Sequence, residues 1–158
     1  TIKTTTFAVL IFLGAKIMGV LLTNLGVFTE LTIWAVALPV PPIGILSVII
    51  LTYLVLGCFM SGLPAIIITL PIFFPIILAL GYDPIWFGVI IVLVDEAGLL
   101  SPPVGSILYI LQGLRPKTPF WVVVKGCIPF FLVILLAIVI LVTFPQLATW
   151  LPNLVFGS

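Results

Sequence analysis

The segment VDEAGLLSPPVG, residues 94–105, holds the residue types best able to do chemistry in this chain. Two adjacent acids, Asp95 and Glu96, precede two adjacent prolines inside a long apolar region. Proline lacks an N–H group and its ring clashes with the preceding turn, so a helix must break here. In a bilayer, freed backbone groups persist only where protein or a water-filled cavity covers them. The segment therefore favours an ion or substrate site over a kink that only serves packing.

The charges beside this break need partners of their own. Adjacent residues point about 100° apart on a helix, so Asp95 and Glu96 cannot share one partner. Lys16 lies near the middle of the first apolar segment, too deep for its ammonium to reach the interface easily. An ion pair between Lys16 and one of the two acids would offset the cost of both charges. For Asp95, a bond to helix-end amides or to a basic neighbour is at least as well supported as an ion site.

A second stretch with functional potential is GCFMSGLP, residues 57–64. Its small residues Gly57, Ser61 and Gly62 allow a tight turn and the close approach of another backbone. The residues alone support a functional tip and a simple packed turn equally well. Cys58 is better interpreted as a small residue of the core than as a reactive thiol.

The composition sets the environment in which these stretches must work. Hydrophobic residues make up 64% of the chain and charged residues only 6%, whereas a soluble domain carries about 25% charged residues. The class is therefore an all-α integral membrane protein. The chain has no histidine, two distant cysteines and a net charge of +1. The histidine and cysteine counts argue against a His/Cys metal centre, a His-based triad and a disulfide framework. The net charge by itself says nothing about nucleic acid, and no nucleic-acid partner is expected.

The apolar runs and helix breakers predict one membrane domain over residues 1–158, a helical bundle that contains a helical hairpin and a broken transmembrane helix. The hairpin arms are each short for a full crossing, so the hairpin is either re-entrant or fully spanning. The expected elements are a transmembrane helix at 5–26, an interfacial helix at 28–38, a helical hairpin at 43–80, a broken transmembrane helix at 84–114 and a transmembrane helix at 119–144.

The charge distribution predicts one topology for a multi-pass protein. Basic residues that flank membrane segments favour the cytoplasmic side. In the predicted scheme the acids Glu30 and Asp83 fall on the opposite side, and the C-terminus faces outward. The basic residues on the cytoplasmic side are Lys3, Arg115, Lys117 and Lys125.

These residues also carry a family resemblance. The stretch LGCFMSGLPAIIITLPIFFPIILALGYDPIWFGVIIVLVDEAGLLSPPVG, together with GAKIMG in the first helix, resembles the C-terminal half of the large permease subunit of tripartite ATP-independent periplasmic (TRAP) transporters. The resemblance implies one inverted repeat of an elevator-type transporter in the bacterial inner membrane, with a periplasmic C-terminus. It also implies sodium-coupled uptake of organic acids (carboxylates), a small permease subunit and a periplasmic binding protein. No cofactor other than sodium is expected.

The same resemblance assigns roles to particular residues. Gly98, Ser101 and the backbone near Val104 match sodium-site positions of the family. The tip from Gly57 through Ser61 to Gly62 matches a hairpin end near the substrate.

The chain also departs from the family pattern. The family commonly has Asn at Val94 and Ile107 and Asp at Ser61, so three polar groups are lost. Asp95 replaces an apolar residue and Lys16 a small or polar one. This double gain of opposite charges favours a Lys16–Asp95 pair.

Two functional hypotheses follow, and neither is an enzyme, because no arrangement of a nucleophile and a base is visible. In the first, the chain is a transporter component that needs the missing first repeat in trans. In the second, it is a truncated TRAP-derived subunit that no longer transports and has a structural role in a larger membrane complex, respiratory or photosynthetic. Either way it contacts the lipid bilayer and other membrane subunits.

Overall fold

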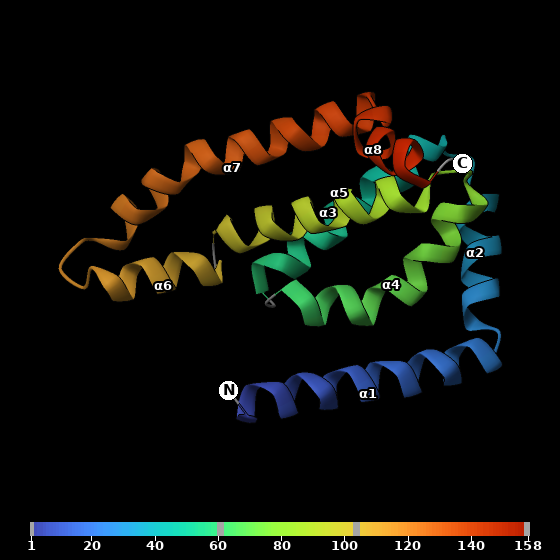
Figure 1. Cartoon of the computed structure of the whole chain (residues 1–158), viewed down its shortest axis with the longest axis horizontal. Helices are drawn as coiled ribbons and strands as arrows, with labels where there is room; N and C mark the ends of the chain where they lie inside the picture. Colours follow the sequence, from blue (N-terminus) through green and yellow to red (C-terminus); the bar gives the residue numbers. More distant parts are fainter. Residues whose placement is uncertain (1, 60–61, 103–104, 157–158) are drawn as a thin grey trace.

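The computed structural model describes residues 2–59, 62–102 and 105–156, and these residues form helices joined by short turns, with no strand among them. The expected all-α class is confirmed. Ser61 and Val104 lie outside the described residues. Figure 1 shows the arrangement of the helices. They are α1 (Ile2–Asn24), α2 (Val27–Ala37), α3 (Pro42–Phe59), α4 (Gly62–Ala79), α5 (Pro84–Leu100), α6 (Ser106–Leu114), α7 (Phe120–Thr143) and α8 (Gln146–Phe156).

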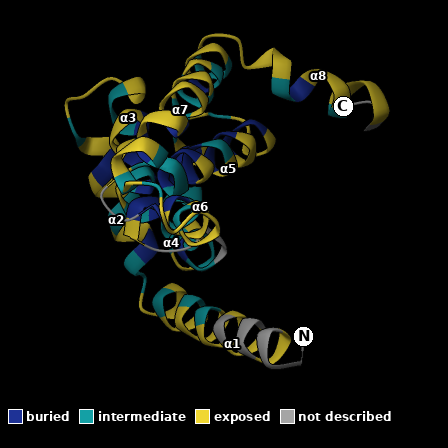
Figure 2. Ribbon diagram, turned by 90° about the vertical axis from the view of Figure 1, so that its left-hand side faces the viewer, coloured by how far each residue is buried: buried dark blue, intermediate teal, exposed yellow. Residues whose placement is uncertain are grey.

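Two of the described helices, α3 and α7, are long and apolar enough to cross a membrane. A third crossing results if Phe12–Asn24 and α2 form one span, bent by 70° at its break. Gly26 supplies this bend, because its φ of 72° is a left-handed conformation that glycine adopts without strain. Large apolar side chains are exposed along α1, α7 and α8, which appear mostly yellow in Figure 2. Such surfaces suit lipid or a protein partner rather than water.

Helices α3 and α4 form the hairpin that the short apolar arms predicted, and they converge where residues 60–61 connect them (Figure 1). A hydrogen bond joins the arms: the hydroxyl oxygens of Tyr53 and Thr69 are 2.8 Å apart. The Tyr53 ring also packs on Phe73 of α4, with ring centroids 5.4 Å apart. The two arms are therefore fixed to each other by both polar and aromatic contacts.

Helix α5 is the central element of the core and packs against α3, α4, α6, α7 and α8. The Asp83 carboxylate caps its start, accepting hydrogen bonds from the N–H groups of Ile85 at 2.7 Å and Trp86 at 3.0 Å. Pro84 takes the first helical position, where no N–H is needed. The Trp86 indole is buried and donates to the Leu141 carbonyl of α7 at 2.7 Å. These contacts fix the helix that carries the segment at 94–105.

Helix α8 lies beyond the last predicted element, which ended at residue 144. It begins after Pro145 and contains Pro152. Its Thr149 side chain is buried, and the helix packs against α5 and α7. Tertiary contacts with these two helices therefore support a helix that its own sequence, interrupted by proline, does not strongly specify.

Candidate functional site

Helices α3 and α5 cross at a pair of glycines, one from each functional stretch. A Cβ built on Gly98 would lie 2.7 Å from the Gly57 Cα atom and 2.8 Å from its carbonyl carbon. It would also lie 3.0 Å from the Leu54 carbonyl oxygen. No side chain fits at these distances, so the two backbones touch directly. The crossing brings the end of the first hairpin arm against the helix that leads into the break.

Asp95 is buried at this crossing, with only 5% of its surface exposed. Its Oδ1 atom would lie 3.6 Å from a Cβ on Gly57, so the carboxyl group points toward the hairpin arm. The same Oδ1 has no hydrogen-bond partner. Leaving such an atom unbonded in a buried position costs free energy. Neither the helix-end amides nor a basic neighbour, the two structural roles expected from the sequence, satisfies Oδ1 here.

One hydroxyl group, that of Tyr53, interacts with this acid, and sequence reasoning missed both Tyr53 and the threonine bonded to it. Asp95 interacts electrostatically with Tyr53 of α3, and Tyr53 is hydrogen-bonded to Thr69 of α4. Thr69 Oγ1 also lies 2.7 Å from the carbonyl oxygen of Ala65, one turn earlier. The expected hairpin could have indicated this pair. Tyr53 and Thr69 each lie eight residues from position 61, the expected hairpin tip, so they occupy matching positions on the two arms.

The break itself begins at Ser101, where α5 ends. The Ser101 N–H donates to the Gly98 carbonyl at 3.0 Å, and its hydroxyl lies 3.3 Å from the Pro102 carbonyl. Before the next helix, Gly105 has a φ of 25°, and a Cβ there would lie 2.7 Å from the Ser101 carbonyl oxygen. The break therefore requires glycine at this position, and it folds back closely on the end of α5.

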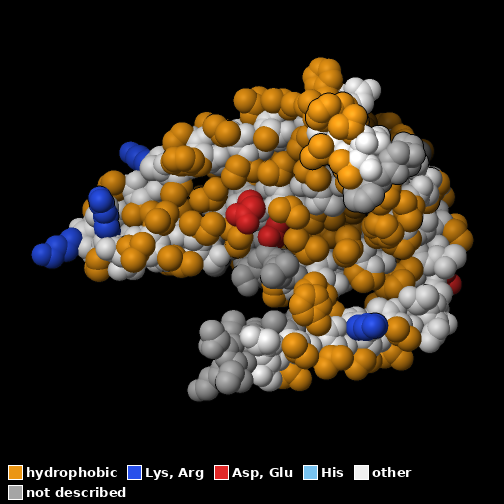
Figure 3. Space-filling model, viewed as in Figure 1, with side chains coloured by type: hydrophobic (Ala, Val, Ile, Leu, Met, Phe, Trp, Pro, Cys, Tyr) orange, Lys and Arg blue, Asp and Glu red, His pale blue; other side chains and the backbone are white. Residues whose placement is uncertain are grey.

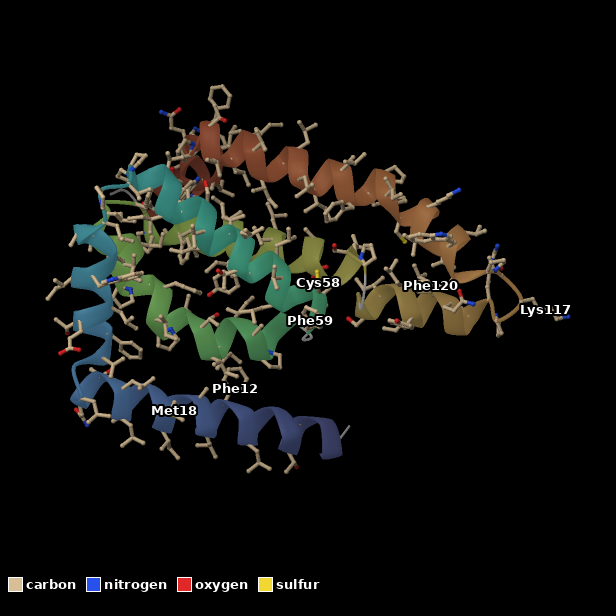
Figure 4. All side chains as sticks on the ribbon, turned by 180° about the vertical axis from the view of Figure 1, so that it is seen from behind. Phe12, Met18, Cys58, Phe59, Lys117 and Phe120 are labelled. Carbon is tan, nitrogen blue, oxygen red and sulfur yellow. The ribbon has the colours of Figure 1, made fainter. Side chains whose placement is uncertain are left out.

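The remaining predicted residues divide between the crossing and other places. Gly62 begins α4, directly after the hairpin tip. Figure 4 shows Cys58 and Phe59 at the end of α3, beside α5. Cys58 is buried and forms no disulfide, as expected for a small residue of the core. Glu96, by contrast, is exposed on α5.

The structure does not bring Lys16 together with the acids. Lys16 is exposed on α1, which packs against α2 and α4, whereas Asp95 lies where α5 crosses α3. Among the residues that the structure describes, no ion pair joins Lys16 to either acid. In Figure 3 the acidic side chains near the middle of the molecule and the basic side chain on α1 lie on separate helices. The expected Lys16–Asp95 pair is therefore not formed in this structure, because the first helix packs on the second hairpin arm instead of on α5.

The chemistry available at the crossing is that of oxygen ligands. Within the described ranges, no group of three or more His, Cys, Asp or Glu side chains could hold a metal ion. A cation here would rely on backbone carbonyls of the break and on the single carboxylate of Asp95. Sodium and other hard cations accept such oxygen ligands.

The hairpin and the broken helix, meeting at a glycine crossing, define an all-α membrane protein. The chain matches the model of the DctM component of the tripartite ATP-independent periplasmic transporter over residues 1–147, and it belongs to this family.

Individual relatives agree with this assignment. The chain is 35% identical over 155 residues to the C4-dicarboxylate TRAP transporter large permease protein DctM of Vibrio cholerae, covering 98% of this chain and 34% of the relative. It is 32% identical over 145 residues to a putative TRAP transporter large permease protein of Haemophilus influenzae, covering 92% of this chain and 34% of the relative. The sialic acid TRAP transporter large permease protein SiaM of Vibrio cholerae is 28% identical over 157 residues, covering 99% of this chain and 36% of the relative.

The chain thus spans about a third of the length of the curated relatives it matches. These relatives are permeases and not enzymes, as the sequence led us to expect. The chain is a membrane component of the TRAP type.

Proposed function

We propose that this chain forms part of the large permease of a sodium-coupled TRAP transporter that takes up an organic acid. The observation that carries the proposal is the Gly57–Gly98 crossing, where the hairpin arm touches the helix that enters the break. Secondary transporters form ion and substrate sites at discontinuous helices, and the close approach of the hairpin arm to a helix of this kind supports the proposal.

In this proposal the break binds the coupling ion. Backbone groups at Gly98, Ser101 and Val104 are the sodium-site positions, and Gly57, Ser61 and Gly62 form the hairpin tip near the substrate. The Asp95 carboxylate adds a negative charge close to the break and favours a cation over an anion there. The protein supplies oxygen ligands and a site covered from lipid, and sodium supplies the positive charge.

The proposed partners follow from the family description as a tripartite transporter. They are the rest of the large permease, a small permease subunit and a periplasmic binding protein. The complex would lie in the bacterial inner membrane, with the C-terminus of this chain in the periplasm. The names of the relatives include a C4-dicarboxylate and a sialic acid permease, so a carboxylate is the proposed class of substrate.

An uptake measurement tests this function. The chain is produced together with the remaining permease, the small subunit and the binding protein, and the complex is reconstituted in vesicles. Addition of sodium outside the vesicles should drive accumulation of a labelled C4-dicarboxylate or sialic acid, and potassium should not. A complex that assembles fully but accumulates neither acid in response to sodium contradicts the proposal.

One observation favours the second candidate, a structural subunit that no longer transports. Val94 is buried with 1% of its surface exposed, so an apolar side chain fills a position beside the crossing where the family resemblance implies Asn. Stoichiometric purification of the chain within a respiratory or photosynthetic complex, without a binding protein, would support this candidate over transport.

A further inference from the structure

The first helix borders a groove that is lined mostly by apolar side chains and also by a lysine. The groove lies between α1 and α4, near the start of α2, and has a volume of about 600 Å³. Apolar side chains line most of it, among them Phe12 of α1, Phe28 of α2, and Ile67 and Pro71 of α4. Figure 4 shows Phe12 on the side of α1 that faces α4. Lys16 lines the same groove and is the one charged residue among the described side chains that line it.

Lys16 has no counter-charge within the described part of the chain. All four acids of the sequence lie in that part, and none forms an ion pair with Lys16. Lys16 lies within α1, whose last residue, Asn24, is eight residues further on, about 12 Å along the axis. An unpaired ammonium group among the apolar residues of a membrane helix is costly and usually pairs with another group inside a helix bundle. Lipid acyl chains in the groove cannot provide that partner.

The packing of α1 also indicates a missing neighbour. Its exposed apolar residues surround the helix, with Phe12 and Leu13 each 52% exposed on the groove side. Its contacts with α4 are loose: a Cβ on Gly19 would meet only Pro71, at 4.0 Å. The chain spans about a third of the length of its relatives, so two thirds of a large permease can supply further helices.

We infer that the groove receives an apolar membrane helix from the part of the large permease outside the matched third, and that this helix carries a carboxylate that pairs with Lys16. The groove selects an apolar helix by its lining, and the ammonium selects an acid at the matching depth. Asp95 cannot fill this role, because it is buried at the α3–α5 crossing. The inference rests on the proposed place of this chain in a large permease, but it concerns assembly and does not require that the complex transports.

Photo-crosslinking in the assembled complex tests the surface directly. A photoreactive phenylalanine analogue replaces Phe12 in the groove or, as the control, Ile17, which is 61% exposed but does not line the groove. The probe at position 12 should crosslink to the remaining large permease, and the probe at position 17 should not. Crosslinks from position 12 only to lipid, to the small subunit or to a second copy of this chain would overturn the inference.

Charge variants test the ion pair. Lys16→Met should lower the yield of the complex with the remaining permease by at least about tenfold, because it leaves the partner carboxylate unpaired. Lys16→Arg should retain most of the yield, since it preserves the charge. Mass spectrometry of the position-12 crosslink identifies the facing helix, and changing its acid to Lys should restore the yield of Lys16→Glu. Full assembly of Lys16→Met, or no acid on the crosslinked helix, would refute the pair even if uptake is normal.

Discussion

The α3–α5 crossing and the first helix illustrate two opposite ways in which this chain uses small residues and charge. At the crossing, Gly57 and Gly98 let two backbones touch, and Asp95 is buried beside them. On α1, Gly14 has no neighbour within 4 Å, and Lys16 is exposed to a groove. The crossing is thus complete within this chain, whereas α1 presents a surface that another helix can cover. A glycine and a nearby charged residue therefore form a close helix crossing in one place and an open surface in the other, depending on which helix packs against them.

The largest expected effect comes from filling the crossing. Gly98→Ala places a methyl group 2.7 Å from the Gly57 backbone, so the two helices must separate. We expect a loss of roughly 1–3 kcal/mol or more of stability, measured as unfolding in detergent. Gly88→Ala is the matched control, because it lies on the same helix with no neighbour within 4 Å. Equal stability of the two variants would contradict the close crossing.

The next effect concerns the unpaired carboxyl group. Asp95→Asn keeps the shape of the side chain and removes its charge, so it should raise the free energy of unfolding by about 1–2 kcal/mol. If Asp95 also assists the coupling ion, the same variant should weaken sodium-dependent uptake. The measurement is unfolding of the chain in detergent, and a variant less stable than the parent protein would contradict an unpaired carboxyl group at this position.

A smaller effect is expected from the bond between the hairpin arms. Tyr53→Phe removes the hydroxyl that bonds to Thr69 and should lower stability by about 0.5–1.5 kcal/mol. Thr52→Val is the control, since the Thr52 hydroxyl bonds only to its own helix, at the Val48 carbonyl. Thermal unfolding of both variants is compared. A larger loss of stability in Tyr53→Phe than in Thr52→Val measures the hydrogen bond between the arms, beyond the effect of removing a hydroxyl group. Equal losses in both variants would mean that the Tyr53–Thr69 bond does not hold the arms together.

The smallest effect is expected on α1. Gly14→Ala should raise helix stability slightly, by up to about 1 kcal/mol, because alanine favours helix and meets no neighbour. The measurement is again unfolding of the isolated chain in detergent. A clear destabilisation of the isolated chain would mean that another part of the chain packs closely against Gly14. The surface of α1 would then not be open, and its difference from the α3–α5 crossing would be lost.

Much of the fold could be predicted from residue types alone. Pro84 and Asp83 specify where α5 begins, and the Pro102–Pro103 pair requires its end, because proline cannot continue a helix. Apolar composition specified helices in a membrane, and the glycine and proline motifs indicated the family. Helix α8 was not foreseen, since Pro152 interrupts it and only contacts with α5 and α7 support it.

The candidate site was predictable only in its parts. The sequence by itself determined that a break and a hairpin tip exist, because backbone chemistry is local. Only the tertiary structure decided that Gly57 touches Gly98, that Asp95 lies buried near Tyr53, and that Lys16 lies on a separate helix. Opposite charges at two positions suggested a pair, but a pair requires that their helices pack together. Here α1 packs against α2 and α4 and not against α5, and the positions of two charges do not determine which helices pack together.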